Sequence, residues 1–171
     1  MTPGEARAEQ YKAGSAERVR AYLDLHGMAD RLVTYQQSTK TAQMAADAMG
    51  CLLGQIVKSL VFVAEGRAVL ALVAGDRRGD GAAIAAEIGA GGSAVFADAE
   101  TVRAATGYAI GGVSPFDLPP ELPVLIDETL SRFEELFPAG GTPNTMLRMS
   151  LAELVGLTGG RMARISHEAP A

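Results

Sequence analysis

The sequence of 171 residues contains no tryptophan, one cysteine and two histidines. A single cysteine, Cys51, excludes an intramolecular disulfide, which fits a reducing compartment such as the cytoplasm. This cysteine cannot combine with His26 and His167, which lie far apart in the sequence, into a zinc site of the usual ligand spacing. The glycine patterns of dinucleotide-binding and phosphate-binding loops are also missing. We therefore expect a protein that uses no metal and no cofactor.

Long apolar runs and an excess of basic charge are lacking as well. No run approaches the roughly 20 apolar residues that a membrane helix needs, and the first residues do not resemble a signal peptide. The formal net charge is −5, from 15 basic and 20 acidic residues. Proteins that bind nucleic acid along its backbone without sequence preference are usually basic. We therefore expect a cytoplasmic protein whose contacts with any nucleic acid are local.

What the sequence does contain is enough apolar material for one folded domain, with 48% hydrophobic residues. Apolar periodicity and helix-capping residues predict both helices and strands, without a strict alternation of the two. This mixture favours an α+β fold, in which short helices flank a mixed, curved β-sheet. We predict helices over residues 16–26, 42–49, 81–88, 99–106 and 151–158, and strands over 31–36, 56–63, 68–73, 93–96, 122–127, 131–137, 145–149 and 161–166.

Capping residues support several of these helices. Thr39 or Thr41 can cap the second helix, and Asp80 and Asp98 can cap the third and fourth. Ser150 is followed three residues later by a glutamate, which is the pattern of a capping box. Between residues 63 and 68 the sequence Ala-Glu-Gly-Arg predicts a hairpin turn.

Two features are candidates for chemistry, each with an ordinary structural alternative. Lys58 stands where an apolar strand begins, in the sequence QIVKSLVF, and either points at water or binds an anion. The sequence GGVSP at residues 111–115 is either a simple turn or a loop whose N–H groups stabilise developing negative charge. The residues alone leave both questions open.

Six segments taken together are more specific than Lys58 or the glycine loop alone. These segments are TAQMAADAMG, QIVKSLVF, LVAGDRR, TGYAIGGVSPF, LPVLIDETL and AELVGLTGGRMARI. Through them, the sequence from about Tyr35 to Ile165 resembles the YbaK and prolyl-tRNA-synthetase-associated editing-domain family. The resemblance implies an editing domain over residues 31–166, preceded by a leader and helix over 1–30 and followed by a tail over 167–171.

Members of this family hydrolyse amino acids wrongly esterified to tRNA, most often to proline tRNA. The resemblance implies that Lys58 holds the terminal adenosine or its phosphate, and that the N–H groups of Gly111 and Gly112 contact the scissile carbonyl. It also implies that Ser114, Pro115 and Tyr35 contribute to substrate binding. An aminoacyl ester is already activated, so orientation and an oxyanion site can suffice for its hydrolysis. The implied partners are the CCA end of aminoacyl-tRNA and prolyl-tRNA synthetase.

One segment departs from the family pattern. Where relatives carry serine and aspartate, or a histidine, the sequence AGGTPNTML offers Ala139, Asn144 and Met146. An asparagine can orient a water or an amino group, but it cannot act as a general base. We expect these three residues to line a pocket for a small amino acid such as Cys or Ala. The departure also leaves an alternative, a tRNA-end or adenosine-binding protein with little or no catalytic activity.

Overall fold

The computed structural model describes residues 15–170, and its centre is a mixed β-sheet. The antiparallel hairpin of β2 (Ile56–Ala64) and β3 (Arg67–Ala74) forms the middle of this sheet. β6 (Val124–Asp127) lies parallel to β3, and β9 (Arg161–Ala163) lies parallel to β6. The single-domain α+β architecture with a mixed sheet is therefore confirmed, while the leader expected over residues 1–14 lies outside the described residues.

The other edge of β2 carries two short strands. β7 (Phe137–Pro138) lies parallel to the start of β2, and β5 (Val95–Phe96) lies antiparallel to its end. Two further pairs lie outside the main sheet, and both are antiparallel. These are β1 (Leu32–Thr34) with β8 (Thr145–Leu147), and β4 (Arg77–Gly79) with β10 (Ser166–Glu168).

The hairpin turn has the geometry that the sequence predicts. Glu65 and Gly66 have positive φ angles of 50° and 74°. Two successive residues with positive φ give the turn a twist that matches the twist of the flanking strands. Glycine at the second position adopts this conformation without steric cost.

Five α-helices of residues 15–170 lie around the sheet, and the expected caps begin four of them. Thr41 accepts a hydrogen bond from Met44 N–H, and Asp80 and Asp98 each accept one from the third residue after them. Ser150 and Glu153 form the predicted capping box. The helices are α2 (Ser15–Asp24), α3 (Ala42–Met49), α4 (Gly81–Glu87), α5 (Ala99–Thr106) and α6 (Leu151–Thr158).

Two predicted strands are wrong. Residues 131–137 do not form one strand, because Asp127 accepts a hydrogen bond from Thr129 N–H and begins a 3₁₀ helix, Glu128–Arg132; only β7 follows, at the end of the segment. Residues 161–166 are divided between β9 and β10. Ile165 N–H, between these strands, donates to Asp127 Oδ1 at 3.0 Å instead of to a strand neighbour.

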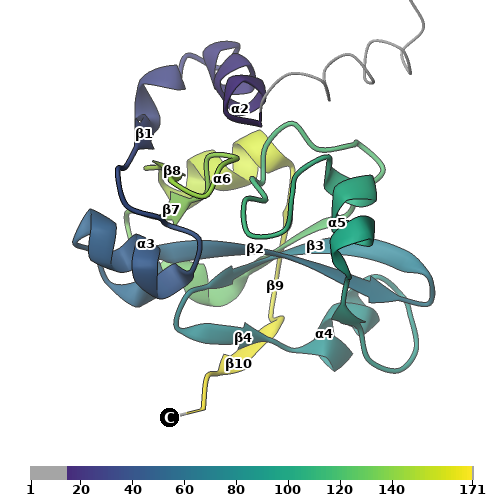
Figure 1. Ribbon diagram of the computed structural model, residues 1–171. Helices are drawn as coiled ribbons and strands as arrows, with labels where there is room; N and C mark the ends of the chain where they lie inside the picture. Colours follow the sequence, from purple (N-terminus) through teal and green to yellow (C-terminus); the bar gives the residue numbers. More distant parts are fainter. Residues whose placement is uncertain (1–14, 171) are drawn as a thin grey trace, which may run out of the picture.

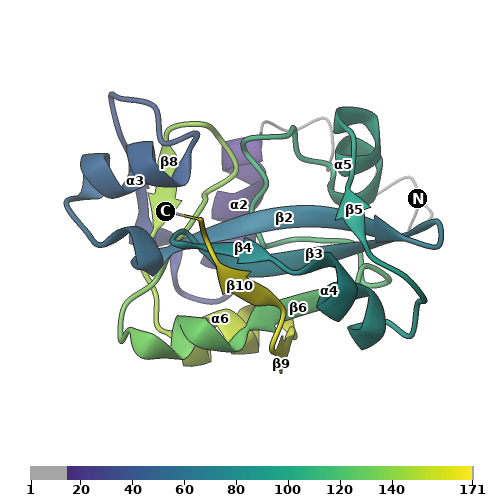
Figure 2. The same cartoon turned by 90° about the horizontal axis from the view of Figure 1, so that it is seen from below.

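The two faces of the central hairpin bury different clusters. Val57 and Val61 belong to a large cluster shared with α2, α5 and α6, on the upper side in Figure 1. Phe62 and Val69 belong to a second cluster, shared with α4 on the lower side. Figure 2 shows β4, β10 and α4 on the near side of the sheet when it is viewed from below. Among the helices of residues 15–170, none combines the length and the apolar character that a membrane span requires.

Candidate active site

A cavity of about 350 Å³ opens along one edge of β2. Its lining includes six successive residues of that strand, 56–61. Successive side chains of a strand point to opposite faces, so one cavity can contact all six only if it runs along the strand's edge. The rest of the lining comes from residues 39–42, 45, 96, 97, 102, 110, 111, 113, 139 and 146.

The edge is open because the neighbouring strands leave a gap. Pairing with β7 ends at Val57, and pairing with β5 begins at Phe62. Between these positions, the described chain adds one hydrogen bond on this side, from Ala97 N–H to the Val61 carbonyl at 3.0 Å. The backbone of β2 is therefore accessible from the cavity around Ser59.

The glycine loop contributes another part of the cavity wall. Gly111 and Val113 line the cavity, and Gly111 has a φ of 86°, which favours glycine. Within the described residues, the Gly111 N–H has no hydrogen-bond acceptor. The Gly112 N–H donates to the Ala109 carbonyl at 3.0 Å, and Gly112 is buried outside the cavity lining. Of the two glycines expected to donate to the substrate, Gly111 alone lines the cavity with an unengaged N–H.

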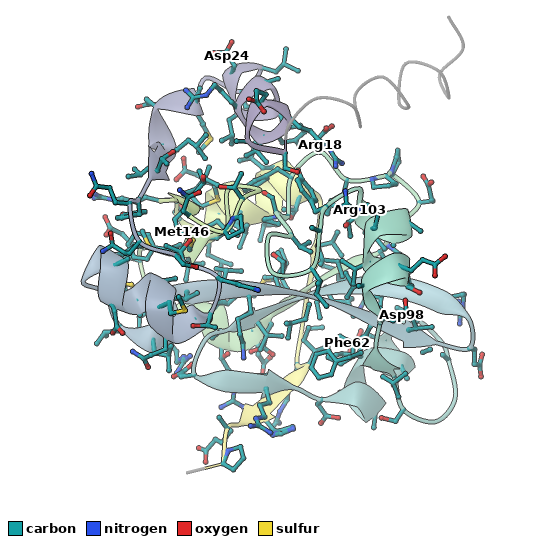
Figure 3. The ribbon with its side chains drawn as sticks, viewed as in Figure 1. Arg18, Asp24, Phe62, Asp98, Arg103 and Met146 are labelled. Atoms are coloured by element: carbon teal, nitrogen blue, oxygen red, sulfur yellow. The ribbon has the colours of Figure 1, made fainter. Side chains whose placement is uncertain are left out.

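The loop that follows these glycines is braced from α2. Arg18, which is 4% exposed, donates from Nε to Asp117 Oδ2 at 2.8 Å and from Nη2 to the Thr106 carbonyl at 3.0 Å. Its guanidinium also lies 4.2 Å from the centre of the Tyr108 ring, and the Tyr108 hydroxyl donates to the Phe116 carbonyl at 2.7 Å. Figure 3 shows Arg18 pointing from α2 toward this loop. The helix α2 thus fixes the position of this loop.

Lys58 lines the cavity, but its ammonium lies toward β4. The Nζ atom donates a hydrogen bond to the Arg77 carbonyl, and the side chain is half-buried. Burial, with a smaller contribution from the positive charge of Arg78, lowers the pKa of Lys58, while Asp76 partly opposes this shift. The lysine is therefore neither fully solvated nor paired with a carboxylate.

The remaining expected residues divide into two groups. Ala139 and Met146 face each other in an isolated β-bridge, and both line the cavity. Tyr35 and Asn144 do not line it; the Asn144 amide donates to the Tyr35 carbonyl at 3.0 Å and so holds β1 to the loop before β8.

Ser114 and Pro115 are buried behind the cavity wall. The Ser114 hydroxyl has no hydrogen-bond partner among the described residues, and neither residue belongs to the cavity lining.

Two lining residues before α3 were not expected from the sequence. Thr39 donates to the Pro143 carbonyl from its N–H at 2.6 Å and from its hydroxyl at 3.1 Å, which anchors the segment. This anchor lays the Lys40 side chain across Gly111, where an added Cβ would lie 3.1 Å from Lys40 Cε. Such a contact between distant segments leaves no periodic signal in the sequence.

Ser59, Phe96 and Ile110 are among the further lining residues that were not expected from the sequence. Phe96 is 68% exposed and Ile110 is 59% exposed, so the cavity has an apolar rim. None of the described residues that line the cavity is acidic, and two of them, Lys40 and Lys58, are lysines. A chain of net charge −5 thus has a locally positive cavity, which suits an anionic ligand.

Comparisons with known proteins agree on the relatives of this chain. A model of the aminoacyl-tRNA editing domain matches residues 36–157. The chain is 33% identical over 141 residues to the uncharacterized protein YwhH of Bacillus subtilis (strain 168), covering 82% of this chain and 88% of that protein. It is 34% identical over 130 residues to the multifunctional Ser/Thr-tRNA deacylase ProXp-y of Escherichia coli (strain K12), covering 72% and 77%. A crystal structure described as that of a proposed trans-editing enzyme for prolyl-tRNA synthetase superposes with a TM-score of 0.82 at 41% identity, covering 91% of this chain and 98% of that one.

Proposed function

Because the chain belongs to the aminoacyl-tRNA editing domain family, we propose that it is a trans-acting deacylase that hydrolyses the ester bond of mischarged tRNA. The family membership confirms the resemblance drawn from the sequence, and the hydrolase class follows from it. The observation that carries the proposal is the unengaged Gly111 N–H in a positively charged cavity.

The proposed chemistry relies on orientation and on stabilisation of the oxyanion. The Gly111 N–H donates to the ester carbonyl oxygen, where negative charge develops as water attacks. Removing one such donor typically costs about 100–1,000-fold in rate, so a single well-placed N–H is a substantial catalytic group. Lys58 and Lys40 attract the phosphates of the CCA end, and holding the ester next to a water supplies the remaining acceleration.

The proposed substrate is proline tRNA that carries a small wrong amino acid, with Cys or Ala preferred. The walls around Ala139 and Met146 are apolar and the cavity is small, which suits such a side chain. The curated relative is named for Ser and Thr, so hydroxylated groups are the main competitors. Apolar walls discriminate one methylene by only about 1–3 kcal/mol, so we expect activity on more than one small aminoacyl group.

The proposal includes further partners and roles that the sequence suggested. Tyr35, Ser114, Pro115 and Asn144 would act by shaping the cavity wall and the loops behind it, because they lie outside its lining. The CCA end of aminoacyl-tRNA would be the bound partner, and prolyl-tRNA synthetase would supply the mischarged species. The reaction would proceed in the cytoplasm without a cofactor.

The test is a deacylation assay with proline tRNA charged with alanine, cysteine, serine or proline. We expect faster release of alanine and cysteine than spontaneous hydrolysis gives, with prolyl-tRNA spared. A Gly111→Ala variant serves as the site control and should lose most of this activity. If no charged species is lost faster than in buffer, while the protein still binds adenosine in a titration, the chain is the binding protein considered as the alternative.

A further inference from the structure

Ser59 lines the cavity and carries polar groups that have no partner within the described part of the protein. Its hydroxyl oxygen is buried and has no hydrogen-bond partner among the described residues. Buried hydroxyls are nearly always paired, because an unpaired one costs about 1–3 kcal/mol of desolvation. An exception in the wall of a cavity points to a group supplied by the ligand.

The backbone of Ser59 faces the same space. The Val61 carbonyl points to the open edge of β2, since it accepts a hydrogen bond from Ala97 N–H there. In an antiparallel strand the N–H and C=O of one residue point to the same side, and this direction repeats every second residue. Ser59, two residues before Val61, therefore directs its own N–H and C=O to the open edge, where neither β5 nor β7 reaches it.

The other polar lining residues are engaged or cationic. The Thr39 hydroxyl donates to the Pro143 carbonyl, and the Thr41 hydroxyl caps α3. Lys40 and Lys58 can only donate hydrogen bonds. Among the described lining side chains, Ser59 thus offers the hydroxyl acceptor without a partner, next to its own unpaired carbonyl.

An aminoacyl ester carries a group that needs such acceptors. Its α-ammonium has three donors and a positive charge, and the described lining holds no carboxylate to receive it. Charged donors bound to neutral oxygens form hydrogen bonds worth about twice those between neutral groups. The Lys58 ammonium does not compete for this position, because adjacent residues of a strand point to opposite faces and its Nζ lies on the Arg77 carbonyl of β4.

We propose that Ser59 binds the α-ammonium of the aminoacyl group through its hydroxyl and its backbone carbonyl. This inference rests on the proposed deacylase function and names the residue that orients the substrate in the cavity. Ser59 and Gly111 line the same cavity, so an ester held at Ser59 would have its carbonyl directed to the Gly111 N–H. The arrangement also predicts that an ester with a blocked amino group is a poor substrate.

The test compares Ser59→Ala with wild type on alanyl-tRNA and seryl-tRNA, with Ser131→Ala as the matched control. The Ser131 hydroxyl is exposed and donates to the Glu128 carbonyl, outside the cavity lining. Loss of a hydrogen bond to a charged group should lower kcat/KM by about 10- to 100-fold on both substrates alike. The melting temperature of Ser59→Ala should stay the same or rise, because the variant removes a hydroxyl that had no partner.

Each other outcome has a defined meaning. Loss on seryl-tRNA only would show that Ser59 contacts the side chain of the substrate, and equal activity of Ser59→Ala and wild type would remove it from the site; both overturn the inference. An inactive wild type would contradict the proposed function instead.

A second measurement needs no turnover. A titration with a 3′-alanylamino analogue of adenosine, which has an amide in place of the ester, should show weaker binding to Ser59→Ala. Binding of plain adenosine should be unchanged. N-acetylation of the alanyl group should abolish the difference between the two proteins, and a difference that persists would overturn the inference.

Discussion

The buried polar groups around Asp127 are paired, whereas two buried hydroxyls in and beside the cavity have no partner among the described residues. The Asp127 carboxylate is fully buried, and it accepts hydrogen bonds from Ile165 N–H at 3.0 Å, Ser166 Oγ at 2.8 Å and Thr129 N–H at 3.2 Å. Ser166 Oγ in turn accepts from Arg77 Nε at 2.7 Å. These bonds join β6, the following 3₁₀ helix, β10 and β4 into one network.

The cavity side follows the opposite pattern. Ser59 and Ser114 have buried hydroxyls without partners in the described part of the chain. Gly111 is exposed, and its N–H has no acceptor among the described residues. In the region around Asp127, which only stabilises the fold, the buried polar groups are therefore paired with one another. An unpaired buried hydroxyl costs stability, so the presence of two of them in and beside one cavity is best explained by a ligand that pairs with them.

The largest expected effect is a loss of folding stability when the hydrogen-bond network around Asp127 is disrupted. Asp127→Ala leaves the Ile165 N–H and the Ser166 hydroxyl without their acceptor. An unpaired buried donor costs about 1–3 kcal/mol, so the free energy of unfolding should fall by about 2–6 kcal/mol. Urea denaturation measures this loss. Asp24→Ala is the control, because Asp24 is exposed on the outer side of α2 (Figure 3), and it should change stability by less than about 0.5 kcal/mol. A small loss for Asp127→Ala would mean that the network is dispensable.

The next largest expected effect is a loss of catalytic rate when Gly111, in the cavity wall, is changed to alanine. An alanine there would have to adopt a φ of 86° and would press on the Lys40 side chain, so the N–H should shift from its position. We expect kcat to fall by about 100–1,000-fold, with a loss of about 1–2 kcal/mol in folding stability.

Gly89→Ala is the matched control for this change. Gly89 has a φ of 71° with open space around it, so its alanine variant has the same backbone strain outside the cavity lining. Its activity should equal that of wild type. If both variants lose activity alike, backbone strain and not the position of the N–H is responsible.

The sequence predicts the local features of this fold well, because they depend on neighbouring residues. The hairpin turn at Gly66 and the caps at Asp80 and Asp98 each follow from a few adjacent positions. The strand predicted over residues 131–137 fails because Asp127 begins a 3₁₀ helix through Thr129. The strand predicted over residues 161–166 is broken because Ile165 N–H donates to Asp127, 38 positions away. Periodicity within a segment contains no information about such a partner.

The site residues also divide into those that the sequence motif predicts and those that depend on contacts between distant segments. Gly111, Lys58, Ala139 and Met146 were expected from the motif and its surroundings, and all four line the cavity. The brace from Arg18 to Asp117 spans 99 positions of sequence. Ser59 could not be predicted as a site residue, because a serine in a strand gives no functional signal in the sequence. It becomes a candidate only once the structure shows that the edge of β2 is open between β5 and β7.

A third prediction concerns the charge of Lys58. If the ammonium holds a phosphate of the tRNA end, Lys58→Ala should lower kcat/KM by about 10-fold or more, since a hydrogen bond to a charged group is worth about 1.5–3 kcal/mol. Lys58→Arg should restore little, because a planar guanidinium has a different shape from a compact ammonium. Deacylation assays at low and moderate salt, with circular dichroism as the check on folding, measure both. Full activity in folded Lys58→Ala would exclude this role.

The smallest expected effect is the pH dependence of stability that Lys58 contributes. Burial holds its pKa in the folded protein below the ordinary value of 10.5. Between these two pKa values the unfolded chain binds more protons than the folded one, so the free energy of unfolding rises with pH in this window. Below the folded pKa the cost of burying the charge is present in full, and it is relieved as the lysine deprotonates.

Lys58→Met lacks this group and isolates its contribution. Tyr22 acts in the opposite direction at alkaline pH, because burial and Asp117 raise its pKa above 10.0, but it is present in both proteins and cancels in their difference. Urea denaturation of wild type and Lys58→Met at about pH 7 and about pH 10 should therefore show wild type gaining stability relative to the variant at the higher pH. A difference that stays constant with pH would mean that the Lys58 ammonium is as well solvated in the fold as in the unfolded chain. Half-burial of Lys58 in the cavity wall would then impose no desolvation cost on its ammonium that a bound phosphate could offset. Lys58 would not belong with the unpaired polar groups that distinguish the cavity from the network around Asp127.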